Sequence, residues 1–193
     1  MRIGLFGGTF DPVHLGHLRA AENAREALSL DLVALVPSAV PPHRGQPLTA
    51  AEDRLAMARL AAGTHPRFEA WDDELRRSGP SYTVETVAAL CSARPLDQLF
   101  LLVGADTWPE MTTWREPERL FSLVEVGVVA RPGVALSRLA PPFPSSRPIH
   151  RVEGPALAIC ATAIRERARD GRSVRYLVPD AVAAYISERR LYA

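Results

Sequence analysis

The chain has 193 residues, 47% of them hydrophobic, so it is long enough to bury one sizeable core, and a second compact domain is not expected. Its 23 basic and 22 acidic residues leave a formal net charge of +1. A protein that binds nucleic acid without sequence preference needs a strong basic excess, so composition excludes that class, and any anion binding must come from a few placed groups.

Cysteine content and hydropathy predict a cytoplasmic protein. Cys91 and Cys160 form no CxxC or zinc-like spacing, which argues against a disulfide framework and fits a reducing cytosol. No apolar run approaches the roughly 20 residues that span a bilayer, and glycine interrupts the N-terminal apolar run too early for a secretory signal. We therefore expect no membrane partner.

Short apolar runs alternate with amphipathic stretches along the chain, which is the pattern of a parallel sheet covered by helices. In chain order, strands are predicted at Arg2–Phe6, Leu32–Val36, Phe68–Trp71, Gln98–Val103 and Glu125–Ala130. Helices are predicted at Leu15–Leu28, from a capping box at residues 49–52 through Ala61, at Val84–Leu90, at Thr162–Arg169 with Thr162 as N-cap, and at Pro179–Glu188. Residues 132–148, with five prolines, are predicted to form an irregular loop.

This order of elements predicts an α/β fold with a doubly wound, Rossmann-like parallel sheet and helices on both faces. We expect a single domain over residues 1–193, with a C-terminal helical part at about 160–193. Ligands of such folds bind at the carboxyl ends of the strands, so the loops that follow the strands are where functional side chains are expected.

The loop after the first predicted strand reads Gly7-Gly8-Thr9-Phe10-Asp11-Pro12-Val13-His14-Leu15-Gly16-His17. It joins a strand to a helix N-terminus, where backbone N–H groups can hold phosphate, and its glycines let a ligand approach the backbone. His14 and His17 share a helix face, where two imidazoles can hydrogen-bond phosphate oxygens and, when protonated, offset charge. The pair also suits zinc, but no Cys/His/Glu cluster supplies the further ligands that zinc needs.

Two further motifs lie beside predicted elements. Pro41-Pro42-His43-Arg44 follows the second strand and, taken alone, is equally well a rigid surface turn. The segment Ser81-Tyr82-Thr83 precedes a helix, where Ser81 or Thr83 can act as N-cap. Free N–H groups at the same helix end can instead hold a carboxylate.

Three more residues are candidates by position. Asp106 follows the central strand, where its carboxylate can accept from a ribose hydroxyl, help to position Mg²⁺ through water, or cap a helix. Trp114 alone is more often part of a core than a ligand platform. Arg131 follows the last predicted strand, where it can be no more than a solvated strand end.

The segment Ile159-Cys160-Ala161-Thr162-Ala163-Ile164-Arg165 carries the last signal. Thr162 suits a helix N-cap, which would place Arg165 in the first turn. A cation is unfavourable there unless an anion lies nearby. A bound phosphate would remove that penalty.

Taken in order, these motifs resemble the nucleotidylyltransferase superfamily, in which a (T/S)-x-x-H-x-G-H element binds the triphosphate, and within it the bacterial nicotinate-nucleotide adenylyltransferases. The resemblance implies that ATP is bound by Gly7, Gly8, Thr9, Phe10, His14, His17, Arg44, Thr162 and Arg165, with His17, His14 and Arg165 catalytic. It implies that the acceptor is bound by Ser81, Tyr82, Thr83, Asp106 and Trp114. Two departures are Arg44, where lysine is common, and Cys160, where serine is usual; a thiol is the weaker hydrogen-bond donor.

The resemblance implies that the chain converts ATP and nicotinate mononucleotide to nicotinate adenine dinucleotide and pyrophosphate. It further implies small-molecule substrates, Mg²⁺ that accompanies ATP, and no metal held by protein ligands alone. A homo-oligomer is left open. So are three alternatives: nicotinamide mononucleotide as acceptor, phosphopantetheine as acceptor, and a nucleotide sensor without turnover.

Overall fold

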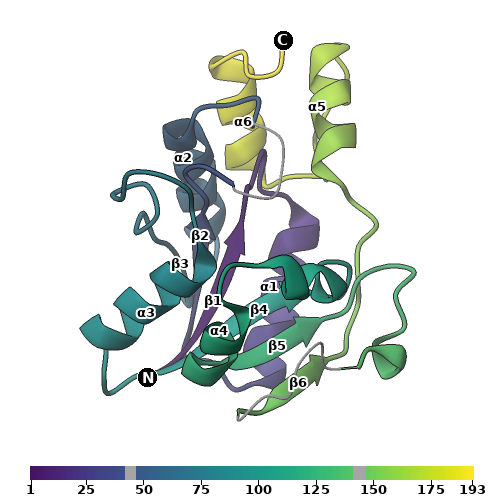
Figure 1. Cartoon of the computed structure of the whole chain (residues 1–193). Coiled ribbons are helices and arrows are strands. Elements are labelled where there is room, and N and C mark those ends of the chain that lie inside the picture. Colours follow the sequence, from purple (N-terminus) through teal and green to yellow (C-terminus); the bar gives the residue numbers. More distant parts are fainter. Residues whose placement is uncertain (42–46, 141–146) are drawn as a thin grey trace.

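The computed structural model of the chain describes residues 1–41, 47–140 and 147–193 (Figure 1). In these residues, six strands form one parallel sheet in the order β3-β2-β1-β4-β5-β6. The strands are β1 (Arg2–Gly8), β2 (Leu32–Pro37), β3 (Phe68–Ala70), β4 (Gln98–Gly104), β5 (Glu125–Val129) and β6 (Ile149–Val152). The helices are α1 (Leu15–Ala27), α2 (Ala51–Ala62), α3 (Thr83–Ala93), α4 (Pro117–Leu123), α5 (Ala161–Arg169) and α6 (Asp180–Glu188), with 3₁₀ helices η1 (Trp108–Thr113) and η2 (Leu136–Arg138). The predicted α/β class is confirmed.

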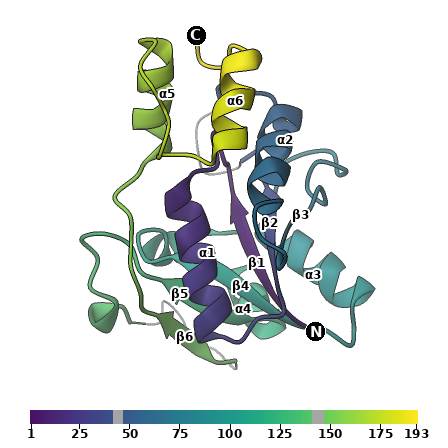
Figure 2. The ribbon, with the colours of Figure 1, turned by 180° about the vertical axis from the view of Figure 1, so that it is seen from behind.

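Helices cover both faces of the sheet, because alternate residues of a strand point to opposite sides. In β4, Phe100 and Leu102 belong to an apolar cluster that includes residues of α1, α2 and α6. Leu99 and Leu101 belong to a second cluster with residues of α3 and α4. Figure 1 views the face that carries α3 and α4, and Figure 2 views the face that carries α1 and α2. Burial on both faces explains why the strands read as continuous apolar runs.

The strand order reverses at β1, which pairs with β2 on one side and with β4 on the other. Chain connections leave these neighbouring strands in opposite directions, so a crevice forms outside their carboxyl ends. The loop after β1, the loop after β4 and the N-terminal end of α1 meet there. The topology therefore places a ligand site where the sequence predicted one.

Both predicted threonine caps are wrong. The N-cap of α2 is Ala50, which makes no side-chain cap bond, because the Thr49 hydroxyl instead donates to Asp11 Oδ1 at 2.5 Å. The N-cap of α5 is Cys160, and Thr162 lies inside the first turn of that helix. In the first case a contact between distant parts of the chain prevails over local cap chemistry.

Several elements were not predicted. The described part of residues 132–148 is irregular apart from η2, but the chain then enters an edge strand, β6, whose pattern includes only one fully buried residue, Val152. The elements η1 and α4 were also missed, and proline stands in the first turn of each. No helix in the described ranges is long and apolar enough to cross a membrane.

Candidate functional site

A cavity of about 590 Å³ opens at the carboxyl ends of β1 and β4. Its walls come from the loop after β1, the segments after β2 and β3, the starts of α3 and α5, and η1. The predicted site residues that line it are Gly7, Gly8, Thr9, Phe10, His17, Ser81, Thr83, Trp114, Thr162 and Arg165. His14, Tyr82 and Asp106 are not in the lining, and Arg44 falls in residues 42–46, outside the described part of the chain.

The loop after β1 forms one wall of the cavity and leaves space for a ligand. A Cβ on Gly7 would meet nothing within 4 Å, so the cavity approaches the backbone here. A Cβ on Gly8 would come within 3.0 Å of the Phe10 ring, which itself closes over this wall. Phe10 has a φ of 50°, so the chain turns sharply before it enters α1.

Arg54 of α2 supports this wall from within the protein, and only 1% of its surface is exposed. Its Nη1 donates to the Thr9 carbonyl at 2.8 Å, and its Nη2 donates to the Ala39 carbonyl at 3.1 Å. Its Nε reaches the Thr49 carbonyl at 3.4 Å. One guanidinium therefore joins three segments around the cavity.

His14 and His17 form a reciprocal cap at the start of α1. His14 Nδ1 accepts from His17 N at 3.3 Å, and His17 Nδ1 accepts from His14 N at 3.2 Å. Because both Nδ1 atoms accept, the proton of each neutral ring is on Nε2. His17 lines the cavity and packs edge-to-face on Phe10 with the ring centroids 5.1 Å apart.

His14 differs from His17 in its burial. Only 3% of His14 is exposed, and this burial, with Arg131 as a lesser cause, lowers its pKa to about 4. The ring is neutral at physiological pH, because desolvation disfavours the charged form. The expected charge compensation by a pair of protonated imidazoles therefore does not extend to His14.

Asp11 accepts hydrogen bonds from several segments of the chain, a role that the sequence did not indicate. Only 5% of it is exposed, and its Oδ2 accepts from Leu48 N at 2.8 Å. Its Oδ1 accepts from the hydroxyls of Thr49 at 2.5 Å and Tyr192 at 2.8 Å. Its backbone carbonyl accepts from Arg165 Nη1 at 2.8 Å. Asp11 thus connects the loop after β1 with α2, α5 and the C-terminal segment.

The start of α5 forms the wall beside Asp11. Arg165 is the fifth residue of α5, two positions later than a cap at Thr162 would place it, and its Nη2 donates to Thr162 Oγ1 at 3.2 Å. Cys160 is exposed, lines the cavity and makes no side-chain cap bond. The basic and hydroxyl groups of this segment therefore face the same space as His17.

The opposite wall is formed at the start of α3. The Ser81 hydroxyl accepts from Ala39 N at 2.9 Å and from Val40 N at 3.2 Å, so it binds the segment after β2 and does not cap the helix. The N-cap is Tyr82, which makes no side-chain cap bond. Thr83 is the first helical residue and lines the cavity.

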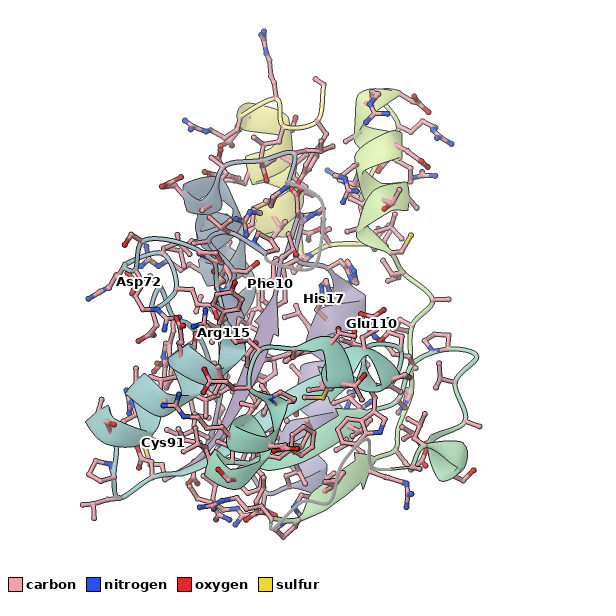
Figure 3. All side chains as sticks on the ribbon, in the orientation of Figure 1. Phe10, His17, Asp72, Cys91, Glu110 and Arg115 are labelled. Atoms are coloured by element: carbon pink, nitrogen blue, oxygen red, sulfur yellow. The ribbon has the colours of Figure 1, made fainter. Side chains whose placement is uncertain are left out.

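Aromatic and charged side chains complete this wall. Trp114, which follows η1, lines the cavity, and so does Arg115. The Arg115 guanidinium carbon lies 4.5 Å from the centroid of the Tyr82 ring. Figure 3 labels Arg115 and Glu110 with Phe10 and His17, which come from different elements and line one cavity.

Asp106 is exposed, lies outside the lining and is paired with a basic residue that is part of it. Its Oδ1 is 3.3 Å from Arg131 Nε, and Arg131 lines the cavity. Gly104 lies directly against this pair, because a Cβ there would collide with Asp106 Oδ1 and come within 3.1 Å of Arg131 Nε. The strand end thus carries a fixed ion pair.

Glu74 is a buried acid in the lining that the sequence did not indicate. Only 7% of it is exposed, and burial raises its pKa above the ordinary value. It accepts a hydrogen bond from Thr86 Oγ1 at 2.9 Å, and the hydroxyls of Thr86 and Ser81 nearby partly offset the rise in its pKa. Arg77 in turn donates to Thr86 Oγ1. Besides Asp11 and Glu74, the lining residues missed include Thr107, Glu110 and Arg115, for which the only sequence signal was a position beyond a predicted strand.

Comparisons with known proteins agree with this geometry. A family model described as cytidylyltransferase-like matches residues 5–167. A Thermus thermophilus protein named "Probable nicotinate-nucleotide adenylyltransferase" is 47% identical over 192 residues, which cover 100% of both chains. A Roseiflexus protein of the same name is 45% identical, over 98% of this chain and 97% of its own.

Solved structures share the fold. The Plasmodium falciparum nicotinic acid mononucleotide adenylyltransferase in complex with NaAD aligns with a TM-score of 0.81 at 16% identity, over 99% of this chain and 97% of that one. The same enzyme in complex with APC aligns with a TM-score of 0.78. On the match to the family model and the identity to full-length relatives, this chain belongs to the cytidylyltransferase-like family and, within it, to the nicotinate-nucleotide adenylyltransferases.

Proposed function

We propose that this enzyme transfers the AMP part of ATP to nicotinate mononucleotide, with pyrophosphate as the second product. The observation that carries the proposal is that two kinds of wall face one cavity. His17 and Arg165 offer donors suited to phosphates, while Trp114 and the N-terminus of α3 offer an aromatic face and backbone N–H groups. The family to which the chain belongs supports the same reaction.

The reaction needs no protein nucleophile. An oxygen of the acceptor phosphate forms a bond to the α-phosphorus of ATP, and the bond from that phosphorus to the bridging oxygen of pyrophosphate breaks. The acceptor phosphate is already anionic near neutral pH, since its second pKa is about 6, and no general base is required. Catalysis then rests on positioning and on stabilisation of charge.

We assign the triphosphate to the end of the cavity that holds His17 and Arg165. Proton placement supports the role of His17, because Nδ1 accepts from His14 N and the proton of the neutral ring is therefore on Nε2. Gly7, Gly8, Thr9 and Phe10 are assigned to the nucleotide, and Thr162 to the same end. His14, which is buried beneath His17, acts through it as a positioning residue.

The site is compatible with Mg²⁺ that enters with ATP and is held mainly by its phosphates. Among the described residues, no three His, Cys, Asp or Glu side chains are grouped so that they could hold a metal ion. Asp106 is already paired with Arg131. Phosphate oxygens would then supply most of the ligands, as Mg²⁺ prefers, and the bound ion would neutralise phosphate charge.

The acceptor is assigned to the wall at α3. Trp114 would stack on the pyridine ring, and the backbone N–H group of Thr83 would hold the carboxylate, since this helix end favours negative charge. The N–H of Tyr82 already donates to the Pro80 carbonyl at 3.0 Å. Ser81 supports this wall through its bonds to the segment after β2. Asp106 would accept from a ribose hydroxyl.

The test is pyrophosphate release from ATP and Mg²⁺ with nicotinate or nicotinamide mononucleotide. We expect rapid release with the nicotinate form, slower release with the amide, and a raised KM for the acceptor in Trp114→Ala. Equal rates with both mononucleotides would remove the carboxylate preference. Absence of release with either would remove the proposed reaction, and phosphopantetheine and ATP binding without turnover would then be tested.

A further inference from the structure

The segment after α6 folds back toward the site. Leu191 N donates to the Ile186 carbonyl at 3.0 Å, and Arg190 and Tyr192 have φ values of 50° and 70°. These left-handed residues reverse the chain direction just beyond the helix. The reversal directs the Tyr192 side chain to the loop after β1, more than 180 residues earlier in the chain.

The hydroxyl of Tyr192 contacts the carboxylate of Asp11. It donates to Asp11 Oδ1 at 2.8 Å, and the ring packs against the apolar cluster that contains α1, α2 and α6. Burial, followed by the charge of Asp11, raises the pKa of Tyr192. The phenol therefore remains protonated at neutral pH and can donate to the carboxylate.

Asp11 in turn determines where two parts of the phosphate end lie. Its carbonyl accepts from Arg165 Nη1 at 2.8 Å, which fixes a cation that faces the cavity. Its Oδ2 accepts from Leu48 N at 2.8 Å, which fixes the segment that leads into α2. Tyr192 itself is not in the cavity lining. Any effect of its hydroxyl on a ligand must therefore pass through Asp11.

We propose that Tyr192 is a positioning residue for the triphosphate end of the cavity, which holds Asp11 and through it Arg165 in the geometry that binds ATP. The inference rests on the proposed function only in taking ATP as the nucleotide. It predicts a defect confined to ATP, because the Tyr192 hydroxyl bonds to Asp11 of the loop after β1 and not to the described residues of the acceptor wall at α3.

A matched control lies on α6. Tyr185 also donates to an aspartate, Asp53 Oδ1, at 2.8 Å, and also ties the C-terminal part of the chain to α2. Neither Tyr185 nor Asp53 lines the cavity. Tyr185→Phe and Tyr192→Phe therefore remove the same group and the same type of bond, and differ in whether the aspartate belongs to the site.

The experiment measures the Kd of MgATP by calorimetry in the absence of any acceptor, after thermal unfolding has shown that each variant is folded. We expect Tyr192→Phe to weaken ATP binding roughly threefold to tenfold, the size of one ordinary hydrogen bond, because the lost bond acts on ATP only through Asp11. Tyr185→Phe should leave it unchanged. Unchanged ATP binding in Tyr192→Phe, or the same weakening in both variants, would overturn the proposal.

The result does not depend on the acceptor, so a failure of nicotinate mononucleotide to react leaves it interpretable. If Tyr192→Phe does not fold, Thr49→Val is used instead, because it removes the other hydroxyl that donates a hydrogen bond to Asp11 Oδ1. Weaker ATP binding in that variant supports the role of Asp11 as the element that Tyr192 positions, and unchanged ATP binding contradicts it.

Discussion

The rings of His14 and His17 stack with their centroids 3.6 Å apart while each ring accepts a hydrogen bond from the backbone N–H of the other residue. This is a capping box built from two imidazoles, where Ser or Thr and Glu or Gln are the usual pair. The start of α1 and the orientation of His17 are therefore fixed by the same two bonds. His17, which we propose binds the triphosphate, is thus held in place by the helix start that it caps.

Replacement of His17 can separate catalysis from capping. Glutamine at this position can accept from His14 N as the imidazole does, so His17→Gln should preserve stability, whereas His17→Ala should lose about 1 kcal/mol. His17→Ala should lower kcat by roughly 10²- to 10³-fold, since it removes a donor to the developing charge. His17→Gln should also lower kcat, because its amide keeps an N–H but cannot take up a proton as imidazole does. Steady-state kinetics and urea unfolding measure the two effects. A kcat of His17→Gln within twofold of the unaltered enzyme would contradict the role of the imidazole.

The buried neutral state of His14 makes stability depend on pH. Its pKa is lowered to about 4 in the folded state, so the unfolded chain binds the additional proton between that value and about 6.5. Stability is then fully present above pH 6.5 and is lost as the pH falls toward 4. Between pH 7 and pH 5 the free energy of unfolding should fall by about 2 kcal/mol on this account. Urea unfolding of the unaltered protein and of His14→Asn, which retains a capping side chain, measures the difference; equal losses would contradict it.

We expect Glu74 to accept hydrogen bonds that stabilise the wall at α3, where nicotinate mononucleotide is proposed to bind. The Ser81 hydroxyl accepts two N–H bonds, which leaves its proton to donate, and the Glu74 carboxylate is a neighbouring group that this hydroxyl influences. Glu74→Leu should raise the KM for nicotinate mononucleotide roughly tenfold, the cost of an unmade buried bond, and leave the KM for ATP unchanged.

Glutamine should rescue most of that loss. Its carbonyl can accept from Ser81, and the Thr86 hydroxyl can turn to the Tyr82 carbonyl, which lies 3.4 Å away. We expect Glu74→Gln to change the KM by less than about threefold and Asp73→Asn, a neighbouring acid outside the lining, to have no effect. If glutamine is as harmful as leucine, the charge of Glu74 and not its hydrogen bonding is what matters.

The two cysteines provide an internal test of nucleotide placement. Cys160 is exposed in the cavity wall, whereas Cys91 is partly buried on α3, outside the lining, and burial raises its pKa. Figure 3 labels Cys91 on that helix. Saturating MgATP should slow alkylation of Cys160 and leave Cys91 unchanged, as peptide mass spectrometry would measure. Equal protection of both thiols, or of neither, would place the nucleotide elsewhere.

The central strands could be predicted because burial on both faces makes each one a continuous apolar run. Gln98–Val103 and Leu32–Val36 differ from the observed strands by one residue at one end. The edge strand β6 could not, since Ile149–Val152 includes His150 and Arg151 and buries only one residue fully. A strand that is covered on fewer sides leaves a weaker pattern in sequence.

The same distinction applies to the site. Motif residues that lie close together in the chain, such as Gly7 to His17, were predicted to act in one place, and the structure places Gly7 and His17 in one cavity lining. Contacts such as Tyr192 to Asp11 join residues 181 apart and follow only from the packing of α6 on the sheet. Glu74 has a similar origin, because its partners lie on another element.

The buried guanidinium of Arg54 has a consequence for how the cavity can change shape. It holds the carbonyls of Thr9, Ala39 and Thr49 at once, in surroundings where a broken bond to a charged group is costly. The wall that these segments form is therefore expected to keep its shape when a ligand binds. Among the described residues, α5 buries only Ile164, so the part of that helix beyond Arg165, and not the wall held by Arg54, is expected to adjust when a nucleotide binds.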